Sequence, residues 1–121
     1  MLQRGIRGAI TIEENTIDAV HSATVELISE IMDKNTFDVE DICSVTFTLT
    51  DDIDCVYPAK IAREVFTDWK YVPMVCFNEM KIENSLSMCL RILIVINTEL
   101  EQNQVKHVYL KGAANLRKDL K

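Results

Sequence analysis

Two arginines lie on segments that have the residue pattern of β-strands. In the segment from Leu90 to Ile96, aliphatic residues alternate on one face, and Arg91 shares the other face with Leu93 and Val95. An unpaired guanidinium in an apolar row has a large desolvation cost. From the residues alone, Arg91 is either a structural arginine, in a salt bridge or at a strand end, or part of a site that recognises a carboxylate or another oxyanion.

Arg7 is likewise either a structural arginine or part of an anion site. It alternates with the small residues Gly5 and Ala9 on another predicted strand. Glu79 follows a further predicted strand, and its carboxylate could pair with Arg7 or Arg91, or accept from a ligand hydroxyl. The simpler interpretation of an isolated glutamate in a loop is a solvated side chain. Arg7, Arg91 and Glu79 are therefore candidates whose roles depend on whether the fold brings them together.

The remaining candidate side chains have ordinary structural explanations. Cys76 is by default a small core residue, and Tyr109 a packed aromatic. Lys60 and Arg63 are typical of a solvated helix face. The chain has no G-x-S-x-G motif and no glycine-rich phosphate loop, which weakens a hydrolase or nucleotide-binding interpretation. The residues alone indicate a small domain with strand-borne arginines suited to an anionic small molecule.

Composition limits the classes of partner. The chain has 121 residues, of which 48% are hydrophobic and 26% charged, which predicts a single domain over residues 1–121. Its formal net charge of −6 argues against nucleic acid and against an anionic membrane surface as partners. The four cysteines form no C-x-x-C pair and lie far in sequence from both histidines, so no metal site is expected.

The sequence also predicts a cellular location. Residues Met1 to Gly5 lack the apolar segment of a secretion signal. The longest apolar run, Ile92 to Ile96, is far too short to span a bilayer. We therefore expect a soluble, cytoplasmic protein whose cysteines are reduced thiols.

Hydrophobic periodicity predicts two helices and five strands. The first helix, capped by Asn15 or Thr16 and ending near Lys34, has one apolar stripe: Ile17, Val20, Thr24, Leu27, Ile28 and Ile31. A second helix begins at Pro58 and ends near Phe66. Strands are expected over residues 4–12, 44–50, 71–77, 86–97 and 105–110, with a loosely ordered tail over 111–121. The order β-α-β-α-β-β-β predicts an α+β fold with helices on one face of a mixed sheet.

Short motifs spread over nearly the whole chain resemble one known family. They are Arg4-Gly5-Ile6-Arg7-Gly8-Ala9, Tyr57-Pro58-Ala59-Lys60, Trp69-Lys70-Tyr71-Val72-Pro73, Glu79-Met80, Cys89-Leu90-Arg91, His107-Val108-Tyr109-Leu110 and Leu116-Arg117. Together they are similar to the monofunctional AroH-type chorismate mutases. The resemblance implies a homotrimer with a barrel-like sheet core and active sites between neighbouring subunits. It also implies the Claisen rearrangement of chorismate to prephenate, on the route to phenylalanine and tyrosine, without metal or cofactor.

The resemblance also implies a role for each candidate residue. Arg91 places a cation at the ether oxygen of the substrate, while Arg7 and Tyr109 bind the enolpyruvyl carboxylate. Glu79 and the region of Cys76 hold the ring hydroxyl. The remaining expected substrate-binding residues are Val75, Phe77 and Asn78 near Cys76, and Tyr57, Lys60, Arg63 and Leu116, which line or close the cleft from the adjacent chain.

Several positions depart from the family pattern, and two other functions stay open. Tyr57 stands where phenylalanine is usual, Val75 stands where threonine is common, and the chain ends early at Lys121. One alternative is a Rid-type imine deaminase on a similar trimeric scaffold. The other is a non-catalytic module that binds a small acid.

Overall fold

The computed structural model describes residues 2–117 and has the predicted order of elements. The strands and helices, in chain order, are β1 (Leu2–Thr11), α1 (Ile17–Lys34), β2 (Ile42–Leu49), α2 (Pro58–Val65), β3 (Met74–Asn78), β4 (Cys89–Thr98) and β5 (Val108–Leu110). The α+β prediction is confirmed. Among the described residues, no helix is long and apolar enough to cross a membrane.

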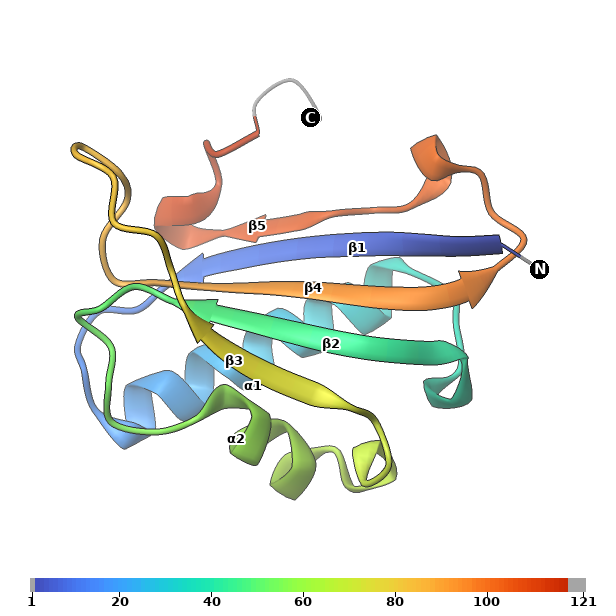
Figure 1. Cartoon of the computed structure of the whole chain (residues 1–121), viewed down its shortest axis with the longest axis horizontal. Helices are drawn as coiled ribbons and strands as arrows, with labels where there is room; N and C mark the ends of the chain where they lie inside the picture. The colour runs from blue at the N-terminus through green and yellow to red at the C-terminus, as the bar shows by residue number, and fades with distance from the viewer. Residues whose placement is uncertain (1, 118–121) are drawn as a thin grey trace.

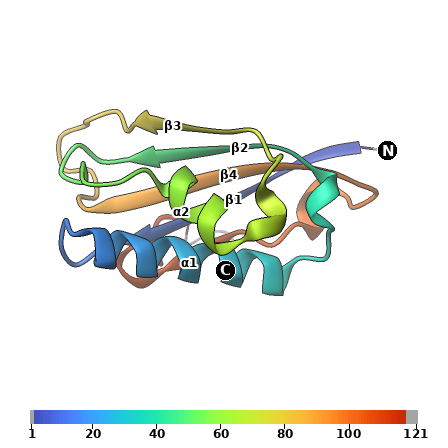
Figure 2. The same cartoon turned by 90° about the horizontal axis from the view of Figure 1, so that it is seen from below.

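The five strands form one mixed sheet in the order β3-β2-β4-β1-β5 (Figure 1). β4 is antiparallel to both of its neighbours, whereas β5 runs parallel to β1 and β3 runs parallel to β2. Figure 2 shows α1 and α2 on the same side of this sheet, as predicted. We call the opposite side, which carries neither helix, the open face.

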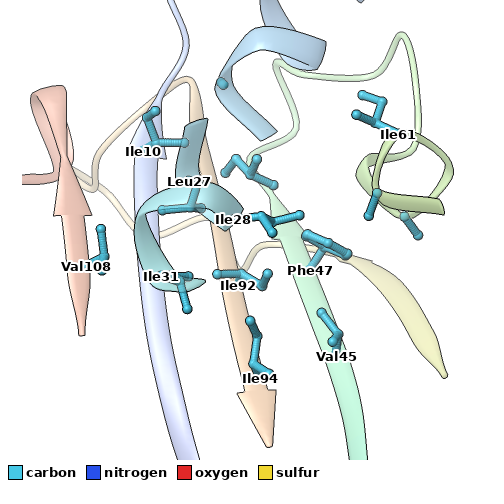
Figure 3. Close-up of a cluster of buried hydrophobic side chains, with 14 of the residues drawn as sticks. Ile10, Leu27, Ile28, Ile31, Val45, Phe47, Ile61, Ile92, Ile94 and Val108 are labelled. Carbon is cyan, nitrogen blue, oxygen red and sulfur yellow. The ribbon is translucent and has the colours of Figure 1, made fainter. Parts of the chain in front are cut away.

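The hydrophobic core fills the space between the sheet and the helices (Figure 3). Alternate residues of the strands, such as Ile92 and Ile94, point into this core, and α1 contributes Leu27 and Ile31. Gly8 allows α1 to pack closely on β1, because a Cβ there would lie 2.9 Å from Ile31 Cδ1 and would force that side chain to shift. The core therefore fixes α1 against β1, and through β1 it fixes the register of the open face.

The ends of α1 follow from its sequence. Thr16 is the N-cap, and its Oγ1 accepts a hydrogen bond from the backbone N–H of Ala19 at 3.2 Å. Asn15, the other predicted cap, instead donates to Asp54. The predicted stripe is confirmed except at Ile17, the first residue of the helix, which is 59% exposed.

Three strands begin later than predicted, and each delay has a local cause. Residues before β3 form a turn closed by a hydrogen bond from the Val72 N–H to the Trp69 carbonyl. β4 begins only after Met88, whose φ of 49° is incompatible with a strand. Residues 105–107 precede β5 as a bend held by the Asn35 side chain, which bonds the backbone of Lys106.

The predicted tail contains more structure than expected. Lys111–Ala113 form a 3₁₀ turn, and Ala113 is fully buried. The turn is fixed by the N–H of Gly112, which donates to Thr11 Oγ1 at 2.8 Å. The prediction of a loose tail is therefore wrong for these residues, and its last part, 118–121, lies outside the described residues.

Candidate active site

The register of the sheet places three side chains in one row across the open face: two predicted site residues and a threonine. Thr48 of β2 pairs with Arg91 of β4, Arg91 pairs with Ala9 of β1, and Ala9 pairs with Tyr109 of β5. Directly paired residues point to the same face. Thr48, Arg91 and Tyr109 therefore lie side by side on the open face, with the small Ala9 between the arginine and the tyrosine.

Arg91 is largely buried and has an anionic partner. Its side chain is 23% exposed, and its Nε lies 3.6 Å from Oε2 of Glu79. That Nε is itself buried and has no hydrogen-bond partner among the described residues. The expected pairing of Glu79 with an arginine is thus observed for Arg91, at a distance that leaves the Nε–H able to donate elsewhere.

Glu79 is fixed by its backbone and its side chain, although it lies just beyond the end of β3. Its N–H donates to the carbonyl of Leu49 at 2.7 Å. Its Oε2 accepts a hydrogen bond from Thr48 Oγ1. These contacts hold the carboxylate at the end of the sheet where Arg91 lies.

Arg7 lies one row further along the open face, where it pairs in register with Leu93. Its backbone N–H donates to Nδ1 of His107 at 2.9 Å, which joins β1 to the start of β5. Burial, together with the nearby cations of Arg7 and Arg117, lowers the pKa of His107. The neutral imidazole with a free Nδ1 is the form that this hydrogen bond requires.

A hollow of about 240 Å³ opens between these side chains, lined among others by Arg7, Thr48, Glu79 and Arg91. We call Arg7, Glu79, Arg91 and Tyr109 the arginine cluster. The hollow is smaller than most small-molecule sites, which have volumes of roughly 300–1,000 Å³. A second surface placed over the open face would be needed to enclose a ligand.

Tyr109 and Leu116 meet at one end of the open face. Both pack against a small buried cluster of Ala9, Cys89 and Ala113. The hydroxyl of Tyr109 is buried and has no hydrogen-bond partner among the described residues, although buried tyrosine hydroxyls usually have one. Within one chain, Leu116 therefore lies beside Tyr109 of the arginine cluster.

A second region lies beside α2. We call it the α2 hollow: a cavity of about 420 Å³ lined by Leu49, Ile53, Asp54, Cys55, Val56, Tyr57, Lys60, Cys76, Phe77 and Asn78. Tyr57 precedes α2 and is 69% exposed, and Lys60 is also exposed. Five residues expected to bind substrate, Tyr57, Lys60, Cys76, Phe77 and Asn78, are therefore brought together here.

Cys76 lies on the helix side of the sheet, against Ala59 and near Arg63. It pairs in register with Phe47, which is fully buried in the core. Burial raises the pKa of the Cys76 thiol more than the Ala59 backbone and the Arg63 cation lower it. The thiol is therefore neutral at physiological pH and points away from Glu79, so within one chain these two residues do not form a joint hydroxyl site.

Val75 is not among the residues that line the α2 hollow. Val75 is 49% exposed and pairs with Thr46, a neighbour of the arginine cluster on the open face. Thr48 and His107 contact Glu79 and Arg7 but were not predicted as site residues. The alternation that puts Thr48 on the open face was visible in the sequence, but its partner across the sheet was not.

The arrangement defines the class of the protein: a small α+β domain with a candidate anion site, in which a partly buried arginine is paired with a glutamate. The sequence profile of the family described as "Chorismate mutase type I" matches residues 3–120, and the chain belongs to this family. The prediction made from the motifs is thereby confirmed.

Two relatives and one solved structure support this assignment. The chain is 38% identical to "Chorismate mutase AroH" of Bacillus subtilis (strain 168), covering 99% of this chain and 94% of that protein. It is 41% identical to the protein of the same name from Thermus thermophilus, covering 97% and 95%. The structure of "Chorismate mutase from Clostridium thermocellum" superposes with a TM-score of 0.85 at 38% identity, covering 90% of this chain and 96% of that one. Neither the imine deaminase nor the non-catalytic module is favoured.

Proposed function

We propose that this chorismate mutase converts chorismate to prephenate in a cleft shared by two copies of the chain. The arginine cluster of one copy would form one wall, and the α2 hollow of the next copy would form the other. The proposal is supported by the separation of Cys76 from the arginine cluster within one chain, since Cys76 pairs with the buried Phe47 on the helix side whereas Thr48 and Arg91 face the open side. It is also supported by the small volume of the hollow beside Arg91, about 240 Å³.

The rearrangement explains which groups the site needs. One C–O bond breaks and one C–C bond forms within the same molecule, so no nucleophile or proton transfer takes part. The protein must hold a flexible dianion in a compact conformer. It must also stabilise the negative charge that develops on the ether oxygen as the C–O bond breaks.

The burial and pairing of Arg91 are the observations that carry this proposal. Its buried Nε–H is without a partner in the described chain, while Glu79 holds the guanidinium in place. A preorganised cation in a site shielded from water stabilises developing charge far more than a solvated one. We assign Arg91 to the ether oxygen.

The other open-face residues would bind the fixed charges and the hydroxyl of the substrate. Arg7 and the buried hydroxyl of Tyr109 are assigned to the enolpyruvyl carboxylate. Glu79 would accept a hydrogen bond from the ring hydroxyl, and Leu116 would cover the end of the cleft beside Tyr109. No metal or cofactor has a role in this scheme.

The adjacent chain would supply the second wall. Its expected contributors are the residues in and around the α2 hollow, namely Tyr57, Lys60, Arg63, Val75, Cys76, Phe77 and Asn78. Val75, Phe77 and Leu93 expose 49%, 59% and 39% of their surface on or beside the open face, which favours burial against another copy. We propose a homotrimer, in which three such clefts form by rotation.

We also propose that residues 1–121 act as one domain in the cytoplasm. The four cysteines are free thiols, which suits a reducing compartment.

The assignment of Arg91 is tested by replacing it and following the loss of the ultraviolet absorbance of chorismate. We expect Arg91→Ala to lower kcat by at least about 1000-fold, because a charge contact made where charge develops is removed. Arg91→Lys should also be severely impaired, since a point charge does not reproduce the guanidinium fork. Near-normal turnover by a folded Arg91→Ala variant would contradict the assignment.

A further inference from the structure

Thr48 belongs to a set of threonines on one face of β2 that the proposed mechanism leaves unused. Thr46, Thr48 and Thr50 alternate along this strand, and alternation places them on the open face. Thr48 is the member that pairs in register with Arg91. Its position therefore distinguishes it from its two neighbours.

The Thr48 hydroxyl and the Arg91 guanidinium converge on a single carboxylate oxygen. Thr48 Oγ1 donates a hydrogen bond to Oε2 of Glu79. The same Oε2 lies 3.6 Å from Nε of Arg91. Neither contact uses Oε1, the second oxygen of Glu79, so that oxygen can accept from another donor.

Glu79 depends on such a contact because it lies beyond the last residue of β3, Asn78. Its backbone is held through Leu49, but a backbone bond does not select among the rotamers of a glutamate. A hydrogen bond to an ionised carboxylate is roughly twice as strong as one between neutral groups. β2, which is paired with a strand on each side, is well suited to supply it.

We propose that Thr48 is a positioning residue for the rearrangement, which orients the Glu79 carboxylate so that one oxygen faces Arg91 and the other faces the substrate. The hydroxyl acts through Glu79 and does not itself contact the substrate. This inference rests on the proposed roles of Glu79 and Arg91. It adds a third member to the polar network, supplied by a different strand.

A double-mutant cycle with chorismate as the substrate tests the inference. Thr48→Val keeps the shape of the side chain but removes the donor, and we expect kcat to fall roughly 10- to 30-fold, the effect of losing a bond to a charged group. In an enzyme that already carries Glu79→Ala, the same change should cost less than about twofold, because the acceptor of the hydrogen bond is absent. Thr48→Ser keeps the hydroxyl and should restore kcat to within about threefold of the parent.

Thr46→Val is the matched comparison, because it makes the same chemical change two residues earlier on the same face. Its effect should be clearly smaller than that of Thr48→Val. Equal losses for the two variants, additive losses in the cycle, or no rescue by serine would overturn the inference. If Thr48→Val does not fold, Thr48→Ala is used in the same cycle.

The proposed function is tested separately in the same assay. If Arg91→Ala and Glu79→Gln are both strongly impaired while Thr48→Val is not, only the role of Thr48 fails. If Arg91→Ala and Glu79→Gln keep near-parental kcat, the proposed function of the cluster itself fails.

Discussion

The arginine cluster and the α2 hollow both carry cations, but they hold them in different ways. Arg91 is 23% exposed and paired with Glu79, and the register of three strands fixes its position. In the α2 hollow, Lys60 is exposed and Tyr57 is 69% exposed. One region is preorganised within the chain, whereas the other has side chains that only a neighbouring surface could immobilise.

This difference indicates how catalytic work is divided between the two regions. Stabilisation of developing charge requires a cation that is fixed and shielded from water before the reaction begins, which describes Arg91. An exposed lysine on a short helix contributes less until it is covered, because water and mobility weaken its field. We therefore expect the arginine cluster to control kcat and the α2 hollow to control closure and substrate affinity.

The largest expected effect tests whether the two regions complete one another across a subunit interface. Arg91→Ala, and a double variant with Lys60→Ala and Arg63→Ala, should each be severely impaired alone. In equally mixed trimers of the two proteins, roughly a quarter of the clefts would combine an intact arginine cluster with an intact α2 hollow, as rotational symmetry requires. Co-refolding followed by the chorismate assay should then recover a comparable share of parental activity.

A mixture of Arg91→Ala with Glu79→Gln is the control, because both changes lie in the arginine cluster and no cleft is repaired. Sedimentation should show trimers for every variant and every mixture. If mixed trimers form but activity does not rise above that of the separate proteins, the shared cleft is wrong.

The fold was largely predictable because its information is local. Alternation in β2 and β4 and the stripe of α1 specify which faces are buried, and those faces are the ones observed. Errors occurred where a backbone conformation decided the boundary, as at Met88 with its positive φ. Ala113 was missed because its burial depends on contacts with Ala9 and Cys89, which are distant in sequence.

The site was less predictable because it depends on pairing between strands. The sequence indicated that Arg91 needed an anion, but the partner could be chosen only after the register placed Thr48 and Glu79 beside it. Parity offered one unused signal: Cys76 and Glu79 are three residues apart, and an odd separation along an extended chain points side chains to opposite sides. That signal predicts that Cys76 and Glu79 face opposite sides of the sheet.

A second, smaller effect compares one tyrosine from each region. The Tyr109 hydroxyl is buried without a partner, so Tyr109→Phe should leave thermal stability unchanged or slightly higher. It should raise KM roughly tenfold if the hydroxyl binds a substrate carboxylate. Tyr57→Phe, in the exposed α2 hollow, should change kcat/KM by less than about threefold.

Steady-state kinetics and thermal melts of both variants distinguish the regions. Equal kinetic effects for the two tyrosines would contradict the proposed difference between the arginine cluster and the exposed α2 hollow. A large loss of stability in Tyr109→Phe would show that the hydroxyl has a structural partner in the assembled protein.

The smallest effect concerns how the free energy of unfolding depends on pH through His107, which contacts Arg7 of the arginine cluster. Burial and the cations of Arg7 and Arg117 lower the pKa of His107 below its ordinary value of 6.5. Lys34 and Lys106 line a cavity that His107 also lines. Because the unfolded chain takes up the proton first, the free energy of unfolding should fall as the pH drops from about 7 to below 6. The contribution should be less than about 1 kcal/mol, since the site is only partly shielded.

Denaturant unfolding at pH 7.5 and pH 5.5, at one fixed protein concentration, measures this contribution. His107→Asn retains a side-chain oxygen that can accept the Arg7 N–H but does not titrate, so its stability should differ less between the two pH values than that of the parent. His21→Asn, on the exposed surface of α1, should keep the parental difference. A His107→Asn protein with the full parental pH dependence would show that a group other than His107 causes the loss of stability in acid.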